Sequence, residues 1–192
     1  MKPLQLGTAG VAAVLLLPPA RQALESSMVA HMLLQVPLLM VCGAMLADCP
    51  VAGRERLARW NSHGIAGLFA VALATALLMV PRLLDLAVAD WRIDVAKAAV
   101  LLACGAALRL SWRPAGPLVQ GFFLGNVLPM TAAVGQLYQD SPLRLCNAYL
   151  LDEQVRLGQA LVAGAVVAGV VWFTALVVAL VRSQPRYRDA KM

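Results

Sequence analysis

Six apolar stretches, separated by short charged loops, run almost end to end through this 192-residue chain. They cover residues 4–17, 28–47, 64–80, 93–112, 118–137 and 157–181. A helix that crosses a bilayer needs about 20 apolar residues, and five of the stretches come close to that length. A soluble core of this size cannot hide so much apolar surface, whereas hydrocarbon can cover it. The sequence therefore predicts an all-α, polytopic membrane helix bundle of about six transmembrane helices, in which residues 1–192 form a single integral-membrane domain.

The first stretch is short, and Pro18 and Pro19 end it. Lys2 and the apolar run 10–17 also have the order of a secretory signal peptide, which is the alternative interpretation. The following Pro-Pro-Ala-Arg-Gln sequence matches a small-x-small cleavage site poorly. We therefore expect the first stretch to be retained as a membrane helix.

Positive charge is concentrated on alternate loops. One set of loops and termini contains ten cations, namely Lys2, Arg54, Arg56, Arg59, Arg109, Arg113, Arg182, Arg186, Arg188 and Lys191, against three acids. The other set contains five arginines against seven acids. Because cytoplasmic loops of membrane proteins are enriched in Lys and Arg, both termini and the 54–59 loop are predicted to be cytoplasmic. An even number of crossings, in a bacterial inner membrane, satisfies this pattern.

Several classes of function are excluded by what the sequence lacks. The net charge of +6 is explained by the cytoplasmic rim and its contact with anionic lipid, so no nucleic-acid partner is expected. The four cysteines show no CxxC spacing, which argues against a structural disulfide and a thiolate metal cluster. No GxSxG, Walker or HExxH motif occurs, so we do not expect an enzyme.

Charged residues at membrane depth are costly and usually face a protein interior. Asp94 and Lys97 lie three residues apart in the fourth stretch, which predicts an internal ion pair on one helix face. The alternative is that Asp94 belongs to an ion or metal path. Asp152 and Glu153 precede the last stretch, where acids favour a helix N-terminus. Within that stretch, small residues at four-residue spacing, Gly164 with Ala168 and Ala165 with Gly169, predict helix-packing faces.

Met28, His31 and Met32 share one face of the second predicted helix, near its outer end. Thioether sulfur and imidazole nitrogen are ligands that select Cu(I) over hard cations. Met79 and Met130 are predicted at similar depth and are candidates to complete the site. The alternatives are that the methionines fill apolar gaps and that the histidine hydrogen-bonds to a neighbouring helix.

Heme is the rival cofactor, and geometry argues against it. His31 lies near the outer end of its helix, and His63 lies at the cytoplasmic start of the next. The rise of a helix separates them by roughly 25 Å, so both cannot bind one iron. A heme ligated by His31 and a methionine is the remaining alternative, and nothing in the sequence requires it.

Two segments together resemble the polytopic CtaG family of cytochrome oxidase assembly factors, the branch associated with caa-type oxidases. The first is residues 27–34, Ser-Met-Val-Ala-His-Met-Leu-Leu, followed by Pro37. It is similar to that family's helix with a His-Met-Val-Gln-His-Met-Leu-Leu type of motif. The second is residues 152–154, Asp-Glu-Gln, with Gly158, which resembles the family's Asp-Gln-Gln-x-x-Gly signature. The resemblance spans about residues 28–175.

The chain departs from the family at some positions. Ser27 stands where the family usually has its first histidine, and Asp94 and Lys97 stand where relatives often have further histidines. The resemblance implies a protein that binds Cu(I) and delivers it by ligand exchange, or assists assembly of a heme-copper cytochrome oxidase. The first alternative is a non-catalytic accessory subunit of a larger respiratory membrane complex. A small transporter with Asp94 and Lys97 in its path is a further alternative.

Overall fold

The structure, a computed structural model, describes residues 3–49, 59–80, 85–87, 90–146 and 149–183, and its regular elements in these ranges are all helices. The all-α prediction is confirmed. Parts of the basic loop and tail that enter the charge argument, including residues 54–58 and 184–192, lie outside the described residues. In chain order the helices are α1 (Pro3–Leu16), α2 (Pro18–Glu25), α3 (Met28–Ala30), the π-helical turn η1 (His31–Gln35), α4 (Val36–Leu46), α6 (Ile65–Leu78), α8 (Trp91–Asp140) and α9 (Leu151–Ser183).

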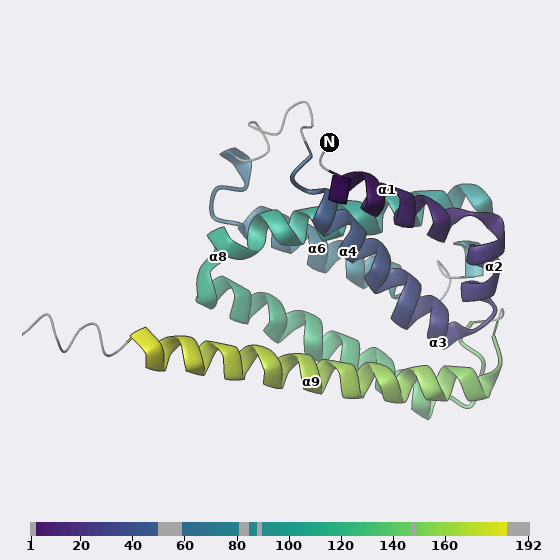
Figure 1. The fold of residues 1–192 in the computed structure, drawn as a ribbon. Coiled ribbons are helices and arrows are strands. Elements are labelled where there is room, and N and C mark those ends of the chain that lie inside the picture. The colour runs from purple at the N-terminus through teal and green to yellow at the C-terminus, as the bar shows by residue number, and fades with distance from the viewer. Residues whose placement is uncertain (1–2, 50–58, 81–84, 88–89, 147–148, 184–192) are drawn as a thin grey trace, which may run out of the picture.

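Helix α8 contains two of the predicted apolar stretches and reverses direction between them. The reversal occurs at Gly116, whose φ of 66° and ψ of 173° are not helical. Pro114 and Pro117 flank it, and Pro117 lacks the N–H that would continue the hydrogen-bond ladder. A positive φ costs glycine little, so Gly116 is where the chain can turn. The first half of α8 runs along the upper layer in Figure 1, and the second half returns beneath it.

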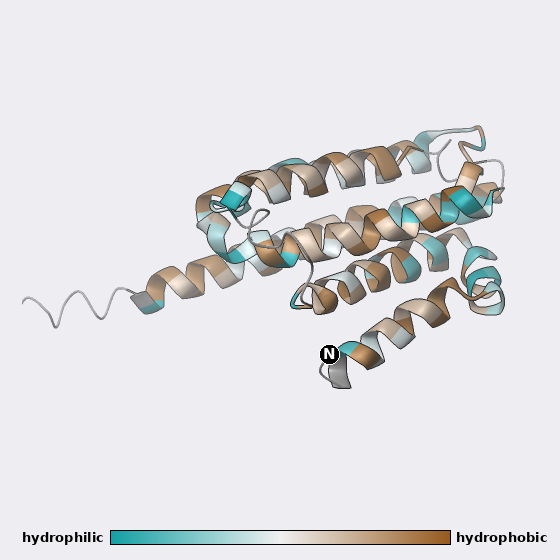
Figure 2. Cartoon of the chain, turned by 90° about the horizontal axis from the view of Figure 1, so that it is seen from above, coloured by the Kyte–Doolittle hydropathy of each residue, from teal (hydrophilic) through white to brown (hydrophobic). Residues whose placement is uncertain are grey.

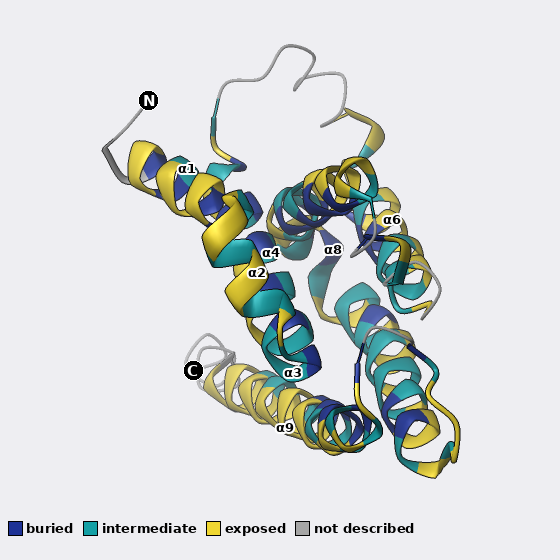
Figure 3. Cartoon of the chain, turned by 90° about the vertical axis from the view of Figure 1, so that its right-hand side faces the viewer, coloured by how far each residue is buried: buried dark blue, intermediate teal, exposed yellow. Residues whose placement is uncertain are grey.

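The two halves of α8 connect two layers of helices. Helices α4 and α6 pack on the first half, α1 packs on α4, and α9 lies along the second half (Figure 1). Seen from the end in Figure 3, buried surface gathers where these helices face one another, while α9 is largely exposed on its outer side. Six long helical segments therefore occupy the six predicted apolar stretches, within one or a few residues at most ends except the start of the last.

Backbones approach closely at two glycine pairs. A Cβ on Gly43 would overlap the Leu102 carbonyl oxygen, and a Cβ on Gly105 would overlap that of Met40, so α4 and α8 cross in direct backbone contact. Gly135 and Gly158 have the same reciprocal relation between α8 and α9. Small residues allow this spacing, as they do at helix crossings in membranes.

Of the two small-residue faces predicted on α9, one packs within the chain and the other is exposed. A Cβ on Gly169 would lie 3.4 Å from Leu128 Cδ1, and Ala165 is buried, so this face packs on α8. Gly164 has no atom within 4 Å of its Cβ position and Ala168 is exposed, so the predicted Gly164–Ala168 face packs against nothing in the described chain. Both faces have the same spacing, and only the orientation of α9 distinguishes them.

The interior of the bundle is mostly apolar but contains several polar residues, and its surface is rich in large apolar side chains. Buried polar residues include His31, Gln35, Asp94, Lys97 and Gln154, whereas large apolar side chains are exposed on every long helix. The hydrophobic (brown) colour follows the middles of the helices in Figure 2, and the hydrophilic (teal) colour gathers mostly near their ends. Two helical segments, Met28–Leu46 and Leu151–Arg182, are long and apolar enough to cross a bilayer by length and composition, and Gln5–Leu16 and Ile65–Leu78 are apolar but shorter. These features suggest membrane association.

Candidate functional site

His31 opens the π-helical turn η1 and is fully buried. The backbone N–H of Val36 donates to the His31 carbonyl, five residues back, instead of to the usual fourth. Pro37, which follows, has no N–H to donate, and a missing donor next to the ladder favours such a widened turn. The π turn changes the direction in which His31 and Gln35 project relative to the rest of the helix.

A chain of charged groups leads from α2 to His31. Arg21 Nε lies 3.0 Å from Glu25 Oε2 and 3.1 Å from Asp94 Oδ2. Lys97 Nζ lies 2.7 Å from Asp94 Oδ1 and 3.3 Å from His31 Nε2. The predicted Asp94–Lys97 ion pair is confirmed, and it is the middle of a longer network.

The network is electrically balanced and mostly dry. Its two cations, Arg21 and Lys97, match its two anions, Glu25 and Asp94, and Asp94 and Lys97 are 2% and 7% exposed. Pairing lowers the free-energy cost of placing each charge away from water, and an unpaired ion in this position would have no such compensation. Burial, followed by the nearby Asp94 carboxylate, raises the pKa of Glu25 above its ordinary value of 4.5. Arg21 and Glu25 were missed by the sequence analysis, although their i, i+4 spacing in α2 is a recognisable ion-pair signal.

The inner end of the network borders a cavity of about 70 Å³. Its wall includes His31, Met32, Thr75, Met79 and Lys97, completed by aliphatic side chains. His31 Nδ1 has no hydrogen-bond partner in the described part of the chain. The structure thus brings together three of the five predicted ligands, His31, Met32 and Met79, from two helices.

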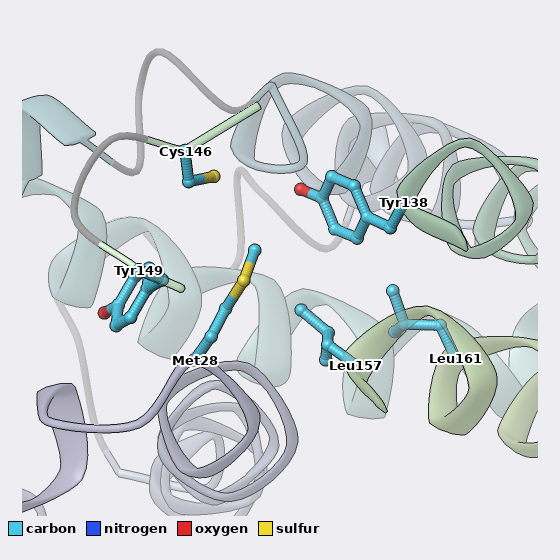
Figure 4. Packing of buried hydrophobic residues seen from close by; sticks show 6 residues of the cluster. All are labelled: Met28, Tyr138, Cys146, Tyr149, Leu157 and Leu161. Atoms are coloured by element: carbon cyan, nitrogen blue, oxygen red, sulfur yellow. The ribbon is translucent and has the colours of Figure 1, made fainter. Parts of the chain in front are cut away.

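The other two predicted ligands lie elsewhere. Met28 is fully buried in a cluster with Tyr138, Cys146, Tyr149, Leu157 and Leu161 (Figure 4). Met32 packs against this cluster as well as bordering the cavity. Met130, which is partly exposed, borders neither the cavity nor the cluster. Met28 fills the cluster and His31 borders the cavity beside it, with the His31 ring centroid 6.5 Å from that of Tyr149 in the cluster.

At the start of α9, Glu153 contacts a second helix and the neighbouring Gln154 anchors the loop. Glu153 Oε2 accepts a 2.7 Å hydrogen bond from the backbone N–H of Met28, so it caps α3 in addition to any effect on its own helix. Asp152 is exposed. Buried Gln154 donates to the Tyr138 and Leu143 carbonyls and accepts from the Leu145 N–H.

Cys146 belongs to this loop and is no thiolate ligand. It is 1% exposed, and burial raises the pKa of its thiol to about 11. The thiol is therefore protonated at neutral pH. In the described ranges, no group of three or more His, Cys, Asp and Glu side chains could hold a metal ion.

The donor set at the cavity is compatible with a soft cation. One imidazole and two thioethers suit Cu(I), which accepts low coordination, and they do not suit Mg²⁺ or Ca²⁺, which require oxygen ligands. Comparisons with protein-family models, curated proteins and solved structures find no match to this chain.

Proposed function

We propose that this protein is a six-pass protein of the bacterial inner membrane with both termini in the cytoplasm. The apolar surface supports this: Val166, Val170, Phe173 and Val177 of α9 are exposed together, while the ion network is enclosed in the interior. In water this exposed apolar surface would promote aggregation, whereas lipid or a membrane partner would cover it. The Lys and Arg asymmetry between alternate loops gives the orientation.

Single-cysteine accessibility tests the topology. Cysteines substituted for Arg59 and Arg182 should react with a membrane-impermeant maleimide only after the membrane is permeabilised. A cysteine at Asp140 should react in intact spheroplasts. Labelling of the Arg182 position from outside would contradict the six-pass arrangement.

We further propose that the cavity binds Cu(I) and that the protein assists assembly of a heme-copper cytochrome oxidase. The observation that supports this is the meeting of His31, Met32 and Met79 at one small cavity, because Met79 comes from a different helix. The resemblance of residues 27–34 and 152–158 to an oxidase assembly family supports the choice of cargo. Copper would be passed on by exchange of soft ligands, so the protein binds and releases the ion without catalysing a reaction.

Metal binding and oxidase content test this function together. The purified protein should bind one Cu(I), measured by competition with a chromogenic chelator, and His31→Ala with Met32→Leu should abolish binding. Met130→Leu is the matched control, because Met130 lies outside the cavity. In the native host the double variant should reduce the copper content of the oxidase. Copper binding that is retained in the double variant would contradict this proposal.

A second function, accessory subunit of a respiratory complex, is favoured by a different observation. A hollow of about 530 Å³ opens between the second half of α8 and α9, lined by small and aromatic residues that include Gly121, Gly125, Gly169 and Trp172. Such a hollow can receive a helix of a partner subunit. The two functions differ in stoichiometry: an accessory subunit remains at one copy in the purified oxidase, and an assembly factor is absent from it.

A further inference from the structure

The Lys97 ammonium contacts Nε2, the ring nitrogen of His31 that faces it. Its ammonium nitrogen lies 3.3 Å from His31 Nε2 and 2.7 Å from Asp94 Oδ1, and the side chain borders the same cavity as Met32 and Met79. The contact is internal, since His31 is fully buried and Lys97 is 7% exposed. The i, i+3 spacing predicts Lys97 as the partner of Asp94 and gives no sign of its contact with His31.

The Lys97 ammonium and a bound metal ion would compete for one electron pair on His31. A lysine ammonium has three N–H donors and no lone pair, so in this contact His31 Nε2 is the acceptor. The Nε2 lone pair is then directed at the ammonium. The same lone pair is the one that would bind a metal ion on that side of the ring, and it cannot serve both cations at once.

We propose that Lys97 is a resident cation that holds the His31 Nε2 position and must move away before a metal ion can bind there. This inference rests on the proposed Cu(I) site and concerns how that site is controlled. Lys97 is a positioning residue that sets the affinity of the cavity, and it is not itself a ligand. In the metal-free protein its charge replaces that of a monovalent ion.

The surrounding charges allow Lys97 to leave His31 without losing its counter-ion. With Lys97 turned away from His31, its ammonium retains Asp94 as a partner, and Asp94 also retains Arg21 at 3.1 Å. If Lys97 is replaced by an uncharged residue, Arg21, Glu25 and Asp94 remain, which leaves one excess negative charge. That excess attracts a monovalent cation toward His31. Removal of the Lys97 charge should therefore strengthen metal binding, because it frees His31 Nε2 and leaves an excess negative charge nearby.

Silver binding in matched variants tests the inference. Ag(I) is a suitable probe because it has the charge and ligand preference of Cu(I) and no redox chemistry under these conditions. Lys97→Leu should bind Ag(I) at least tenfold more tightly than the unchanged protein, measured by competition titration in detergent. Arg109→Leu is the control, because it removes a cation from the same helix at an exposed position, and it should leave the affinity unchanged. Lys97→Gln serves as the second variant if the leucine protein does not fold.

The outcomes separate this inference from the proposed function. Equal Ag(I) affinity in the unchanged protein and both folded Lys97 variants would overturn the role of Lys97 while leaving the metal site intact. Absence of Ag(I) binding in all of them, or binding that persists in Lys97→Leu with His31→Ala, would overturn the metal site and this inference together.

A metal-free measurement provides an independent decision. ¹⁵N NMR of the imidazole, in a His63→Ala background so that His31 is the single histidine, should show a neutral ring with the proton on Nδ1 and Nε2 as an acceptor. Lys97→Leu should remove the shift of Nε2 that this hydrogen bond causes. A proton on Nε2 in the unchanged protein would overturn the inference regardless of how metal binds.

Discussion

The two ends of α8 pack in different ways. Its first half faces α4 and contributes Asp94 and Lys97 to a buried ion network, with direct backbone contact at Gly43 and Gly105. Its second half faces α9 through the Gly135–Gly158 pair and then separates from it around an apolar hollow. The first region depends on specific partners, because each buried charge needs its counter-charge. The second depends on shape and on whatever surrounds it, so it tolerates change better.

Enlarging a glycine at a close helix crossing should have the largest effect, whereas enlarging one on an open face should have little. Gly105→Leu would place side-chain atoms on the Met40 carbonyl, and no rotamer avoids its Cβ. We expect a loss of more than about 3 kcal/mol, enough to prevent folding. Gly164→Leu should be neutral in thermal unfolding in detergent, because its Cβ position is open. A folded Gly105→Leu protein of unchanged stability would contradict the close crossing of α4 and α8.

Breaking the ion network should have the next largest effect. Asp94→Asn removes the carboxylate shared by Arg21 and Lys97, which leaves a buried ammonium without its counter-ion. The expected cost is about 3–5 kcal/mol in the free energy of unfolding. Asp140→Asn, at an exposed position, should change it by less than about 0.5 kcal/mol. Equal unfolding temperatures for the two variants would show that the network does not stabilise the first region.

Loss of the loop anchor should have an intermediate effect on the second region. Gln154→Leu removes three hydrogen bonds that attach residues 138–145 to α9, and it leaves buried backbone groups unpaired. We expect a loss of about 2 kcal/mol. The control is Gln159→Leu, an exposed position on the same helix. Faster hydrogen exchange at Leu145 in the first variant alone would identify the loop as the affected segment.

The smallest expected effect is a pH dependence from Glu25. Burial raises its pKa in the folded protein above 4.5, so the folded state binds this proton more tightly than the unfolded state. The stabilisation is therefore complete below about pH 4.5 and is lost as the pH rises through the raised pKa. The difference in unfolding free energy between the unchanged protein and Glu25→Gln should fall over that window. A difference that rises instead would reverse the assigned direction.

Sequence patterns predicted the helices and one ion pair better than they predicted the contacts between helices. Apolar runs and loop charges predicted the six helical segments, and i, i+3 spacing predicted the Asp94–Lys97 pair that the structure contains. Sequence patterns also selected His31, Met32 and Met79, which border one cavity. Such patterns are local, and local spacing is what a sequence states directly.

The remaining features depend on how helices are rotated about their axes. Spacing gave equal weight to the Gly164–Ala168 and Ala165–Gly169 faces, and only one is packed. Likewise, the spacing of Met28 and His31 does not reveal that Met28 fills the Tyr138 cluster while His31 borders the cavity beside it. Arg21 and Glu25 lie outside the apolar stretches, so their connection to Asp94 is visible only once α2 is placed over the end of α8.

The π turn at His31–Gln35 gives one continuous helix two angular registers. One additional residue in a turn shifts every later side chain by about 100° around the axis. Before the turn, Met28 is in register with the Tyr138 and Tyr149 cluster; after it, Gly43 is in register with its crossing on α8. A regular helix of the same sequence could satisfy one of these partners and would turn the other outward. The turn therefore acts as a phase adjustment, and removal of a single residue from it would realign one half of the helix at the expense of the other.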